Sequence, residues 1–361
     1  MSEEVMTGET MQAAVWHGPN DLRLEHCPIP QVVPGSILVK VEACGICGSD
    51  LRILKTGNPR ITEPRIIGHE ISGTVVEVGV GVEKFNVGDR ISTGADVPCG
   101  KCVHCIAGRG NCCDINFAIG YQFDGGFADY VLFNKMVVDY GPIKKFGDDL
   151  SWEQAAVAEP FACCINGYER ALFEPHTGGD VVIFGAGPIG LMLMTIGRQF
   201  YDADHIYMIE PSAYRRDLAL SLGADIVIDP SHESPVDIIM ELTSGQGVKA
   251  IFTACPDART HAQAVKMVAK RGVVNLFGGL PKDAPAIEIF SNDLHYREAY
   301  ITGSHGSTPE NHALALELIE NGQVNVTPLI SGIHSLNEIH QAFKDATDGK
   351  SSKIIIRPTF K

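Results

Sequence analysis

The sequence has few basic residues for its length. Lysine and arginine number 29 among 361 residues, against 44 aspartate and glutamate, and the formal net charge is −15. Binding to nucleic acid needs a basic surface that neutralises phosphates, and a net negative field repels polyanions. The composition therefore excludes a general affinity for nucleic acid and favours a small-molecule function.

Segments that would direct the chain into or across a membrane are also missing. The first ten residues, MSEEVMTGET, are acidic and polar, without the positive start and apolar run of a signal peptide. Residues 181–197 form the one uncharged stretch that could pass for a span, but it is short and rich in glycine. We therefore expect a cytoplasmic protein, where disulfides are uncommon, and the length of 361 residues suggests two domains.

Cysteines are concentrated in one segment, CGKCVHCIAGRGNCC. Cys99, Cys102, Cys105 and Cys113 are separated by two, two and seven residues. This spacing favours a tetrahedral zinc site, and four protein sulfurs would make that zinc structural. An iron–sulfur cluster is the alternative ligand, although the bacterial ferredoxin run has a different last interval and ends in Cys-Pro. Four unrelated buried thiols are the simpler alternative, and Cys112 is the spare cysteine of the doublet.

A second set of metal-binding residue types is spread over three segments. These segments are ACGICGSDL at residues 43–51, GHE at residues 68–70 and AEPFACC at residues 158–164. A thiolate, an imidazole and a carboxylate could hold a catalytic zinc and leave a position for water or an alcohol oxygen. Each segment alone is a weak signal, because a single His-Glu pair is more often a surface or core pair. Their occurrence together supports a catalytic site.

The segment GAGPIG has the glycine spacing of a dinucleotide-binding turn. Gly185, Gly187 and Gly190 follow the apolar run VVIF, and a segment of helical character follows them. Pro188 suits the first turn of that helix, where its missing N–H would have had no partner, and Ile189 lies beside it. The free N–H groups at the start of the helix would attract a pyrophosphate.

An acidic residue follows the next strand of the expected nucleotide-binding unit. The run HIYMIE ends at Glu210, where a carboxylate would bind the ribose hydroxyls of NAD and repel the 2′-phosphate of NADP. Arg215 and Arg216 lie just beyond and could accommodate that phosphate, or could be the exposed start of a helix. We expect NAD in preference to NADP.

Taken in order, CGICGSD, GHE, the four-cysteine lobe, the Glu-Pro dipeptide and GAGPIG resemble the zinc-dependent medium-chain dehydrogenase/reductase family. The resemblance is strongest to the polyol (sorbitol), sugar-phosphate and threonine dehydrogenases. It implies an α/β protein with a GroES-like, β-rich catalytic domain over residues 1–155, including a structural zinc lobe at about residues 95–115. A Rossmann domain with a doubly wound parallel sheet would span residues 156–293, and residues 294–361 would return to the catalytic domain.

Strand candidates support the Rossmann part of this expectation. The sequence predicts five apolar strands separated by helical stretches, at residues 181–187, 205–210, 226–229, 249–255 and 272–278. The resemblance places the active site in the cleft between the two domains.

The resemblance also implies roles at the catalytic zinc. Cys47 matches the thiolate ligand and His69 the imidazole ligand, whereas Cys44 is expected to be a small core residue. Glu70 and Glu159 would share the carboxylate role, directly or through water. Together with the four-cysteine lobe, this gives two zinc ions per chain, one catalytic and one structural.

Two further residues have roles implied by the resemblance. Ser49 matches the hydroxyl that passes the substrate proton toward solvent, and Asp50 the carboxylate that orients His69. Zinc would lower the pKa of the substrate hydroxyl, and the alkoxide would release hydride to the nicotinamide.

The family pattern leaves the substrate open. A polyol or sugar-derived secondary alcohol, free or phosphorylated, is the first expectation; a threonine-type or simple secondary alcohol is the alternative. A non-catalytic binding protein on the same fold is a remote alternative. Sorbitol-type enzymes resemble GVFRY where this chain reads GSHGS, so that the position of their arginine falls on Gly306. Many members have a histidine where Arg52 stands here. The family further suggests a homodimer or homotetramer.

The segment LRILKTGNPRITEPRI carries a local excess of positive charge. It contains Arg52, Lys55, Arg60 and Arg65 against the single acid Glu63. A solvated loop is the simpler interpretation. The alternative is that Arg52 and Lys55 bind an anionic group of the substrate, because paired hydrogen bonds suit a phosphate or carboxylate.

Overall fold

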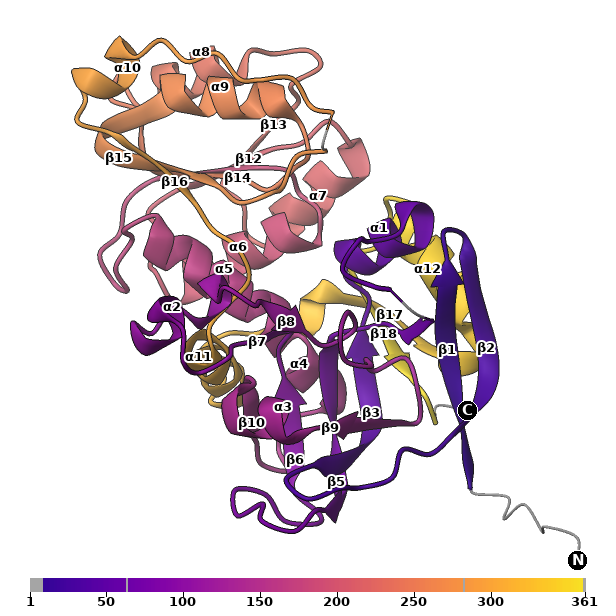
Figure 1. Cartoon of the computed structure of the whole chain (residues 1–361). Helices are drawn as coiled ribbons and strands as arrows, with labels where there is room; N and C mark the ends of the chain where they lie inside the picture. Colours follow the sequence, from indigo (N-terminus) through magenta and orange to yellow (C-terminus); the bar gives the residue numbers. More distant parts are fainter. Residues whose placement is uncertain (1–8, 63, 282, 360–361) are drawn as a thin grey trace, which may run out of the picture. The chain divides into compact units, whose positions relative to one another are not determined.

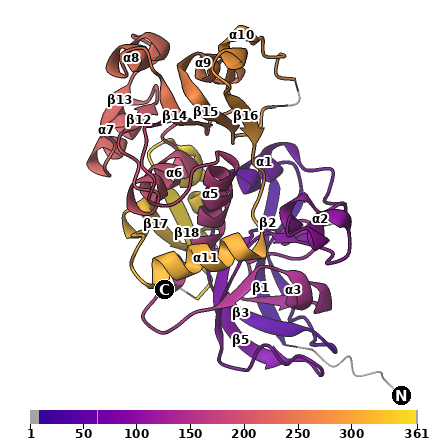
Figure 2. The same cartoon turned by 90° about the vertical axis from the view of Figure 1, so that its left-hand side faces the viewer.

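The chain forms two compact units. The computed structural model describes residues 9–62, 64–281 and 283–359. The first unit comprises Met1–Glu159, Ser307–Glu320 and Ile330–Lys361, and the second comprises Pro160–Gly306 and Asn321–Leu329. The indigo and yellow ribbons of Figure 1 show that segments from both ends of the sequence share the first unit, and Figure 2 gives a second view.

Three β-sheets build the first unit. The largest has seven strands in the order β10-β6-β5-β3-β18-β17, with β9 paired to β3. Its strands are β3 (Ile37–Gly45), β5 (Glu70–Val78), β6 (Arg90–Thr93), β9 (Tyr130–Phe133), β10 (Ile143–Lys145), β17 (Ile330–Ser335) and β18 (Lys353–Arg357). The smaller sheets consist of β2 (Asp21–Pro28), β1 (Thr10–Gly18) and β4 (Arg65–Ile66), and of β7 (Asp96–Val97) with β8 (Phe117–Ala118).

The central strands form because their residues suit a pleated, buried surface. β3 reads ILVKVEACG, in which β-branched and small residues are buried and Lys40 and Glu42 are only partly so. It pairs with β5 in antiparallel register, so that Gly45 lies opposite Glu70. Gly45 leaves the space that the Glu70 carboxylate occupies, because a Cβ at residue 45 would clash with it.

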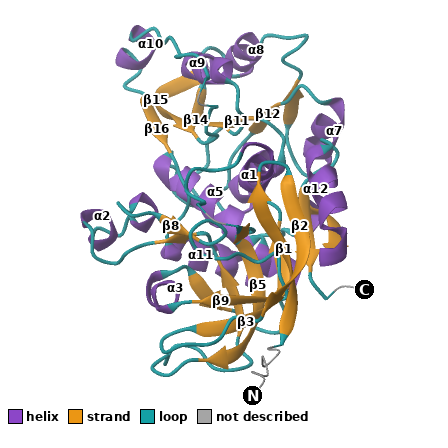
Figure 3. Cartoon of the chain, turned by 45° about the vertical axis from the view of Figure 1, so that its right-hand side comes forward, coloured by secondary structure: helices purple, strands orange, loops and turns teal. Residues whose placement is uncertain are grey.

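Short helices complete the first unit, as Figure 3 shows. They are α1 (Gly48–Thr56), α2 (Val103–Ile106), α3 (Lys135–Tyr140), α4 (Trp152–Ala156), α11 (Pro309–Glu320) and α12 (Ile339–Thr347), with the 3-10 turns η1 (Gly110–Cys112) and η3 (Leu336–Glu338). α1 and α12 pack on the same hydrophobic core, to which Ile53 and Phe343 contribute buried side chains. The core therefore fixes the start of α1, where the sequence predicts the catalytic cysteine.

The second unit is a parallel six-stranded sheet in the order β13-β12-β11-β14-β15-β16. Its strands are β11 (Val181–Phe184), β12 (Ile206–Ile209), β13 (Ile226–Ile228), β14 (Val248–Thr253), β15 (Val268–Leu276) and β16 (Tyr300–Gly303). Its helices are α5 (Ala158–Arg170), whose first residues belong to the first unit, α6 (Pro188–Gln199), α7 (Ala213–Ser221), α8 (Pro235–Leu242), α9 (Ala258–Met267) and α10 (Asn292–His295), with the 3-10 turn η2 (Thr327–Leu329). The strand order reverses at β11, which is the switch point where doubly wound sheets bind ligands.

All five predicted strands of this sheet are present, but the expected boundary at residue 293 is too early. β16 pairs in parallel with β15, from Val273 opposite Tyr300 to Leu276 opposite Gly303. This sixth strand keeps the second unit continuous to Gly306, and a later segment, residues 321–329, also belongs to it. The boundary expected after residue 155 lies at Glu159.

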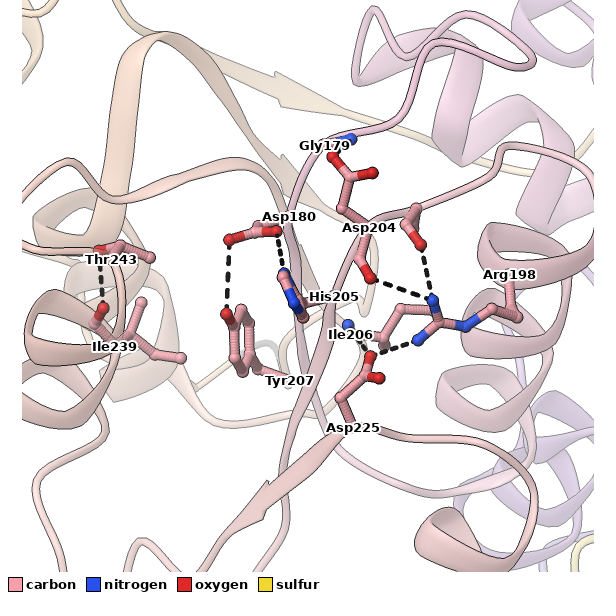
Figure 4. Close-up of polar contacts among 11 residues, drawn as sticks. Gly179, Asp180, Arg198, Asp204, His205, Ile206, Tyr207, Asp225, Ile239 and Thr243 are labelled. Atoms are coloured by element: carbon pink, nitrogen blue, oxygen red, sulfur yellow. Dashed lines mark hydrogen bonds and ion pairs between the residues drawn. The ribbon is translucent and has the colours of Figure 1, made fainter.

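Polar side chains close the amino-terminal end of the parallel sheet, as Figure 4 shows. Asp180, which precedes β11, accepts a hydrogen bond from His205 Nδ1 at 2.8 Å. Asp225, which precedes β13, pairs with Arg198 and accepts the Ile206 N–H at 2.7 Å. Asp204 accepts the Gly179 N–H at 2.7 Å. These contacts occupy the end of the sheet opposite the GAGPIG turn.

No helix among the residues that the structure describes is long and apolar enough to cross a membrane. The uncharged stretch at residues 181–197 divides into strand β11, a turn and most of helix α6. Its apolar character comes from burial on both sides of the sheet.

A buried histidine joins α11 to the central sheet of the first unit. His312 is fully buried, and its Nε2 lies 3.2 Å from the Ser92 hydroxyl oxygen. That hydroxyl donates its only proton to the Ala155 carbonyl at 2.7 Å, so it can only accept from His312. His312 Nδ1 is then an acceptor, and it has no partner among the described residues. Burial lowers the pKa of His312 to about 4.

This histidine should make stability depend on pH. Because the pKa of His312 is lowered to about 4 from an ordinary value of 6.5, the unfolded chain takes up the proton first. The free energy of unfolding should therefore fall as pH drops from 6.5 toward 4, by about 3 kcal/mol for this group. Urea unfolding across this range should show a shallower fall for His312→Leu than for the exposed control His340→Leu. Equal slopes in the two variants would contradict the prediction.

Candidate active site and metal sites

Cys47 is fixed at the amino terminus of α1. Its backbone N–H donates to Asp50 Oδ2 at 2.9 Å, and its carbonyl accepts from the Leu51 N–H at 3.3 Å. Asp50 is fully buried, so this contact holds the first turn in place. The Cys47 sulfur is therefore held at a fixed position beside the first turn of α1.

The GHE segment brings an imidazole and a carboxylate beside this thiol. Gly68 has a φ of 93°, and a Cβ there would meet Cys44 and Phe127, so glycine is needed before the strand begins. His69 and Glu70 are buried where β5 begins. One ligand atom from each of Cys47, His69 and Glu70 lies within 4.8 Å of the others. A sulfur, a nitrogen and an oxygen donor form a set that fits zinc.

Asp50 also faces the imidazole. Its Oδ1 lies 3.6 Å from His69 Nδ1, and both atoms are buried without a hydrogen-bond partner in the described part of the chain. Burial acts to lower the pKa of His69, but the charges of Asp50 and Cys47 outweigh it and raise this pKa well above its ordinary value. The carboxylate therefore acts electrostatically on the ring, and the orienting role predicted for Asp50 stays a prediction.

A lysine that sequence reasoning missed pairs with Glu70. Lys353, the first residue of β18, places its Nζ 2.7 and 2.8 Å from the two carboxylate oxygens and 3.1 Å from the Ile46 carbonyl. Both side chains are buried. Burial acts to lower the pKa of Lys353, but Glu70 and Cys47 outweigh it and hold this pKa above its ordinary value. Lys353 therefore competes with any metal ion for the Glu70 carboxylate.

Glu159 lies near this cluster without belonging to it. It stands in the first turn of α5 and is 5% exposed. Burial raises its pKa to about 7, with further contributions from Glu70 and Asp96 and an opposing one from His69. The structure therefore brings Cys47, His69 and Glu70 together and leaves Glu159 as a nearby second carboxylate.

Ser49 and a tyrosine complete the surroundings of His69. The Ser49 hydroxyl lies 3.4 Å from His69 Nε2, and Tyr121 is close enough for Ser49 to influence the pKa of its phenol. The Tyr121 ring lies 6.1 Å from the His69 ring, and the Arg60 guanidinium lies 4.9 Å from the centre of the tyrosine ring. Burial raises the pKa of Tyr121, so its phenol stays protonated at neutral pH. Sequence reasoning missed Tyr121, whose only local signal is an aromatic residue in the glycine-rich run GYQFDGG.

The four-cysteine lobe gathers its predicted sulfurs. One Sγ each from Cys99, Cys102, Cys105 and Cys113 lies within 4.8 Å of the others. The Cys102 and Cys105 sulfurs are 3.4 Å apart, and the Cys99 N–H donates to the Cys113 sulfur at 3.3 Å. Cys112 is exposed and outside this group, as predicted for the spare cysteine. Four sulfurs at this separation fit a tetrahedral zinc.

The comparisons with known proteins agree with this arrangement. A family described as the alcohol dehydrogenase GroES-like domain matches residues 33–141, and one described as zinc-binding dehydrogenase matches residues 188–321. The chain is 31% identical to D-arabitol-phosphate dehydrogenase of Enterococcus avium, with 98% of this chain and 97% of the relative covered. It is 34% identical to L-threonine 3-dehydrogenase of Thermococcus kodakarensis, with 97% and 99% covered.

A solved structure resembles the chain over the same extent. It is a Sinorhizobium meliloti protein assigned to the zinc-binding dehydrogenases and bound to NADP, with 31% identity and a TM-score of 0.88. The match covers 97% of this chain and 100% of that one. The chain belongs to the zinc-dependent medium-chain dehydrogenase family. It is an oxidoreductase that acts on CH–OH groups, and its GroES-like and Rossmann parts match the predicted fold class.

The GAGPIG turn of the dehydrogenase lies between β11 and α6, as the pattern requires. Gly185 has a φ of 96°, and Gly187 and Pro188 begin α6. A Cβ at Gly190 would clash with the Gly185 carbonyl, so glycine lets the helix pack closely on the turn. Ile189, also predicted near the cofactor, is half-buried in the first turn of α6.

A pocket of about 440 Å³ opens beside this turn within the second unit. Gly185, Glu210 and Arg215 line it, together with Asp257 and Arg259, which sequence reasoning missed. Glu210 is 4% exposed, and its carboxylate oxygens accept the N–H groups of Ala186 at 2.8 Å and Ser212 at 2.9 Å. The predicted ribose-binding carboxylate thus also fixes the loops around the pocket.

The two arginines after β12 have different positions. Arg216 pairs with Asp229 at 2.8 Å and donates to the Glu210 and Pro211 carbonyls, so it is engaged in local structure. Arg215 lines the pocket. Only Arg215 of the pair is therefore placed to meet a cofactor there.

The basic residues between Cys47 and GHE also fall into two groups, two engaged in local contacts and two exposed beside a hollow. Arg60 donates to the Asn116 carbonyl, and Arg65 pairs with Asp124 at 3.0 Å. Arg52 and Lys55 are exposed on α1 and line a separate hollow of the first unit. The predicted counter-charge Glu63 lies outside the described residues.

The buried Glu70–Lys353 pair should contribute strongly to the free energy of unfolding. In the metal-free protein, Lys353→Met should lower the free energy of unfolding by about 3–5 kcal/mol, because it leaves a buried carboxylate without its partner. The double variant Glu70→Gln, Lys353→Met should recover part of this loss. As a control, Lys135→Met breaks the exposed pair with Asp139 and should cost about 0–1 kcal/mol. Equal losses for Lys353→Met and Lys135→Met in urea unfolding would contradict a structural role for the buried pair.

Proposed function

We propose that the chain is an NAD-dependent zinc dehydrogenase that transfers hydride between NAD(H) and a secondary alcohol or its ketone. A polyol or sugar-derived alcohol, free or phosphorylated, is the proposed substrate. The observation that carries the proposal is the cluster of Cys47, His69 and Glu70 within 4.8 Å, beside the Ser49 hydroxyl. The relative named D-arabitol-phosphate dehydrogenase supports the substrate class.

Two zinc ions per chain are part of this proposal. Cys47 and His69, with Glu70 or Glu159, would hold a catalytic ion, and Cys99, Cys102, Cys105 and Cys113 a structural one. Zinc, when bound, supplies a Lewis acid that lowers the pKa of a substrate hydroxyl. The chemistry of both donor sets fits the metal.

The protein's own residues would handle the proton and the geometry. Ser49, whose hydroxyl lies 3.4 Å from His69 Nε2, would receive the substrate proton. Tyr121, which lies near Ser49 and beside the His69 ring, would continue that path in place of the histidine that many members have at the position of Arg52. Asp50 would keep the His69 ring oriented, and Lys353 would hold the Glu70 carboxylate in position.

Metal analysis and turnover test the site assignment together. Cys47→Ala and His69→Ala should each lower zinc content by one ion per chain and reduce kcat by about a thousandfold or more, without unfolding the chain. Cys102→Ala should also lose one zinc, but its main effect should be a fall in thermal stability. The neighbouring exposed cysteine gives the control, since Cys112→Ala should change neither quantity.

Two results would overturn this assignment. Near-normal kcat in Cys47→Ala would remove Cys47 from the catalytic site. Loss of zinc in Cys112→Ala, with zinc retained in Cys113→Ala, would reverse the assignment of the cysteine doublet.

Glu210 is proposed to select NAD. Glu210→Ala should weaken NAD binding by about 10- to 100-fold, because it removes a charged hydrogen-bond acceptor, and should relax discrimination against NADP. Arg215→Ala should weaken NADP more than NAD. Cofactor titrations measure the effect on binding. Thermal melting of the cofactor-free variants measures the effect of losing the Ala186 and Ser212 contacts on stability. A wild-type preference for NADP, the cofactor in the Sinorhizobium meliloti structure, would contradict the proposal.

L-threonine is the second candidate substrate, because a threonine dehydrogenase is 34% identical over nearly the whole chain. An NAD-linked screen over polyols, their phosphate esters, L-threonine and simple secondary alcohols decides between the classes. Turnover of L-threonine alone would overturn the polyol proposal. A zinc-loaded, NAD-binding chain that oxidises none of them would revive the non-catalytic alternative.

We also propose a homodimer or homotetramer in a reducing cytoplasm. β16 is an edge strand of the parallel sheet, and Phe290, Tyr296 and Tyr300 are exposed near it. Edge strands and exposed aromatic side chains favour association. All eleven cysteines are free thiols in the structure, as a reducing compartment allows. Light scattering that gives the monomer mass, or fractionation outside the cytoplasm, would contradict these proposals.

A further inference from the structure

A hollow of about 540 Å³ lies between α1 and α12 of the first unit. Figure 1 shows these two helices side by side, and both pack on the same core. Leu51, Leu54 and Phe343 are its apolar lining residues. The polar lining residues are Asn20, Arg52, Lys55, His340, Lys344 and Thr347. The volume is that of a small-molecule site.

The cations of this hollow have no partner. Arg52, Lys55 and Lys344 are exposed, and their side chains make neither an ion pair nor a hydrogen bond with any described residue. Three such cations in one hollow are unexpected in a chain with a net charge of −15. Their mutual repulsion favours the entry of an anion.

The acids of the two helices are committed elsewhere, and no carboxylate lines the hollow among the described residues. Asp50 on α1 is buried and bonds the Cys47 N–H at 2.9 Å. Asp345 on α12 pairs with His334 at 3.1 Å and accepts from Gln341. The positive charge of the hollow is therefore not neutralised from within these helices.

We propose that this hollow binds the phosphate group of an organic phosphate. The Arg52 guanidinium can form paired hydrogen bonds to phosphate oxygens, and Lys55 and Lys344 add charge from α1 and α12. Leu51, Leu54 and Phe343 offer surface to the carbon part of the same ligand.

The position along α1 connects this hollow to the reaction. Arg52 follows Ser49 by three residues, and residues at this spacing are neighbours on a helix surface. A phosphorylated polyol could therefore reach from the cluster at Cys47 to the hollow, with its phosphate distant from the reacting carbon. This connection rests on the proposed function; the phosphate site itself does not.

Binding measurements test the site without requiring turnover. The zinc-loaded full-length protein is titrated by calorimetry with D-arabitol 5-phosphate, D-arabitol, inorganic phosphate and NADH as separate probes. Arg52→Gln and Lys344→Gln should each raise the Kd of the phosphate ester by about fivefold or more, and added salt should weaken binding. Lys270→Gln, which removes an exposed lysine of the second unit, is the matched control and should leave the Kd unchanged.

The probes identify the source of the phosphate. Loss of affinity for D-arabitol 5-phosphate and inorganic phosphate, with NADH unaffected, assigns the hollow to a phosphate monoester. Loss of affinity for NADH alone assigns it to the cofactor diphosphate. Unchanged affinity for every phosphate compound in Arg52→Gln, Lys344→Gln overturns the proposal. An enzyme that binds the ester through these residues but oxidises no polyol would refute the proposed function and leave this site standing.

Discussion

The buried ion pair between Glu70 and Lys353 is the contact on which the first unit depends. A carboxylate with no exposed surface is costly unless a cation accompanies it, and here the cation comes from 283 residues away. The pair joins the start of β5 to the start of β18, and Lys353 also binds the Ile46 carbonyl, next to Cys47. The buried Glu70 beside Cys47 and His69 therefore depends on a partner from the carboxyl-terminal part of the chain.

The same pair organises the chemistry around it. Glu70 contributes to raising the pKa of the nearby Glu159, while Lys353 opposes that effect. Two carboxylates of different character thus lie near one thiol and one imidazole. Glu70 is paired with a permanent cation, whereas Glu159 depends mainly on burial and has a pKa of about 7.

Features encoded by local spacing could be predicted from the sequence. The four clustered cysteines and the GAGPIG turn fold as their intervals indicate, because a few residues of backbone set the geometry. Lys353 and Tyr121 could not be predicted, since each meets the site through a long-range contact and stands in a segment with no distinctive pattern. The predicted end of the second unit at residue 293 is wrong for a related reason. β16 joins the sheet through its pairing with β15, which the local sequence does not reveal.

The return of the chain to the first unit has a consequence for its synthesis on the ribosome. Strand β18 pairs with β3 in the seven-stranded sheet and β17 pairs with β18, yet both are among the last segments translated. The second unit ends at Leu329 and is complete before either strand emerges. Glu70 therefore lacks its counter-ion until nearly the whole polypeptide has been made. A nascent chain arrested before Lys353 would hold a finished second unit and a buried glutamate without its cation.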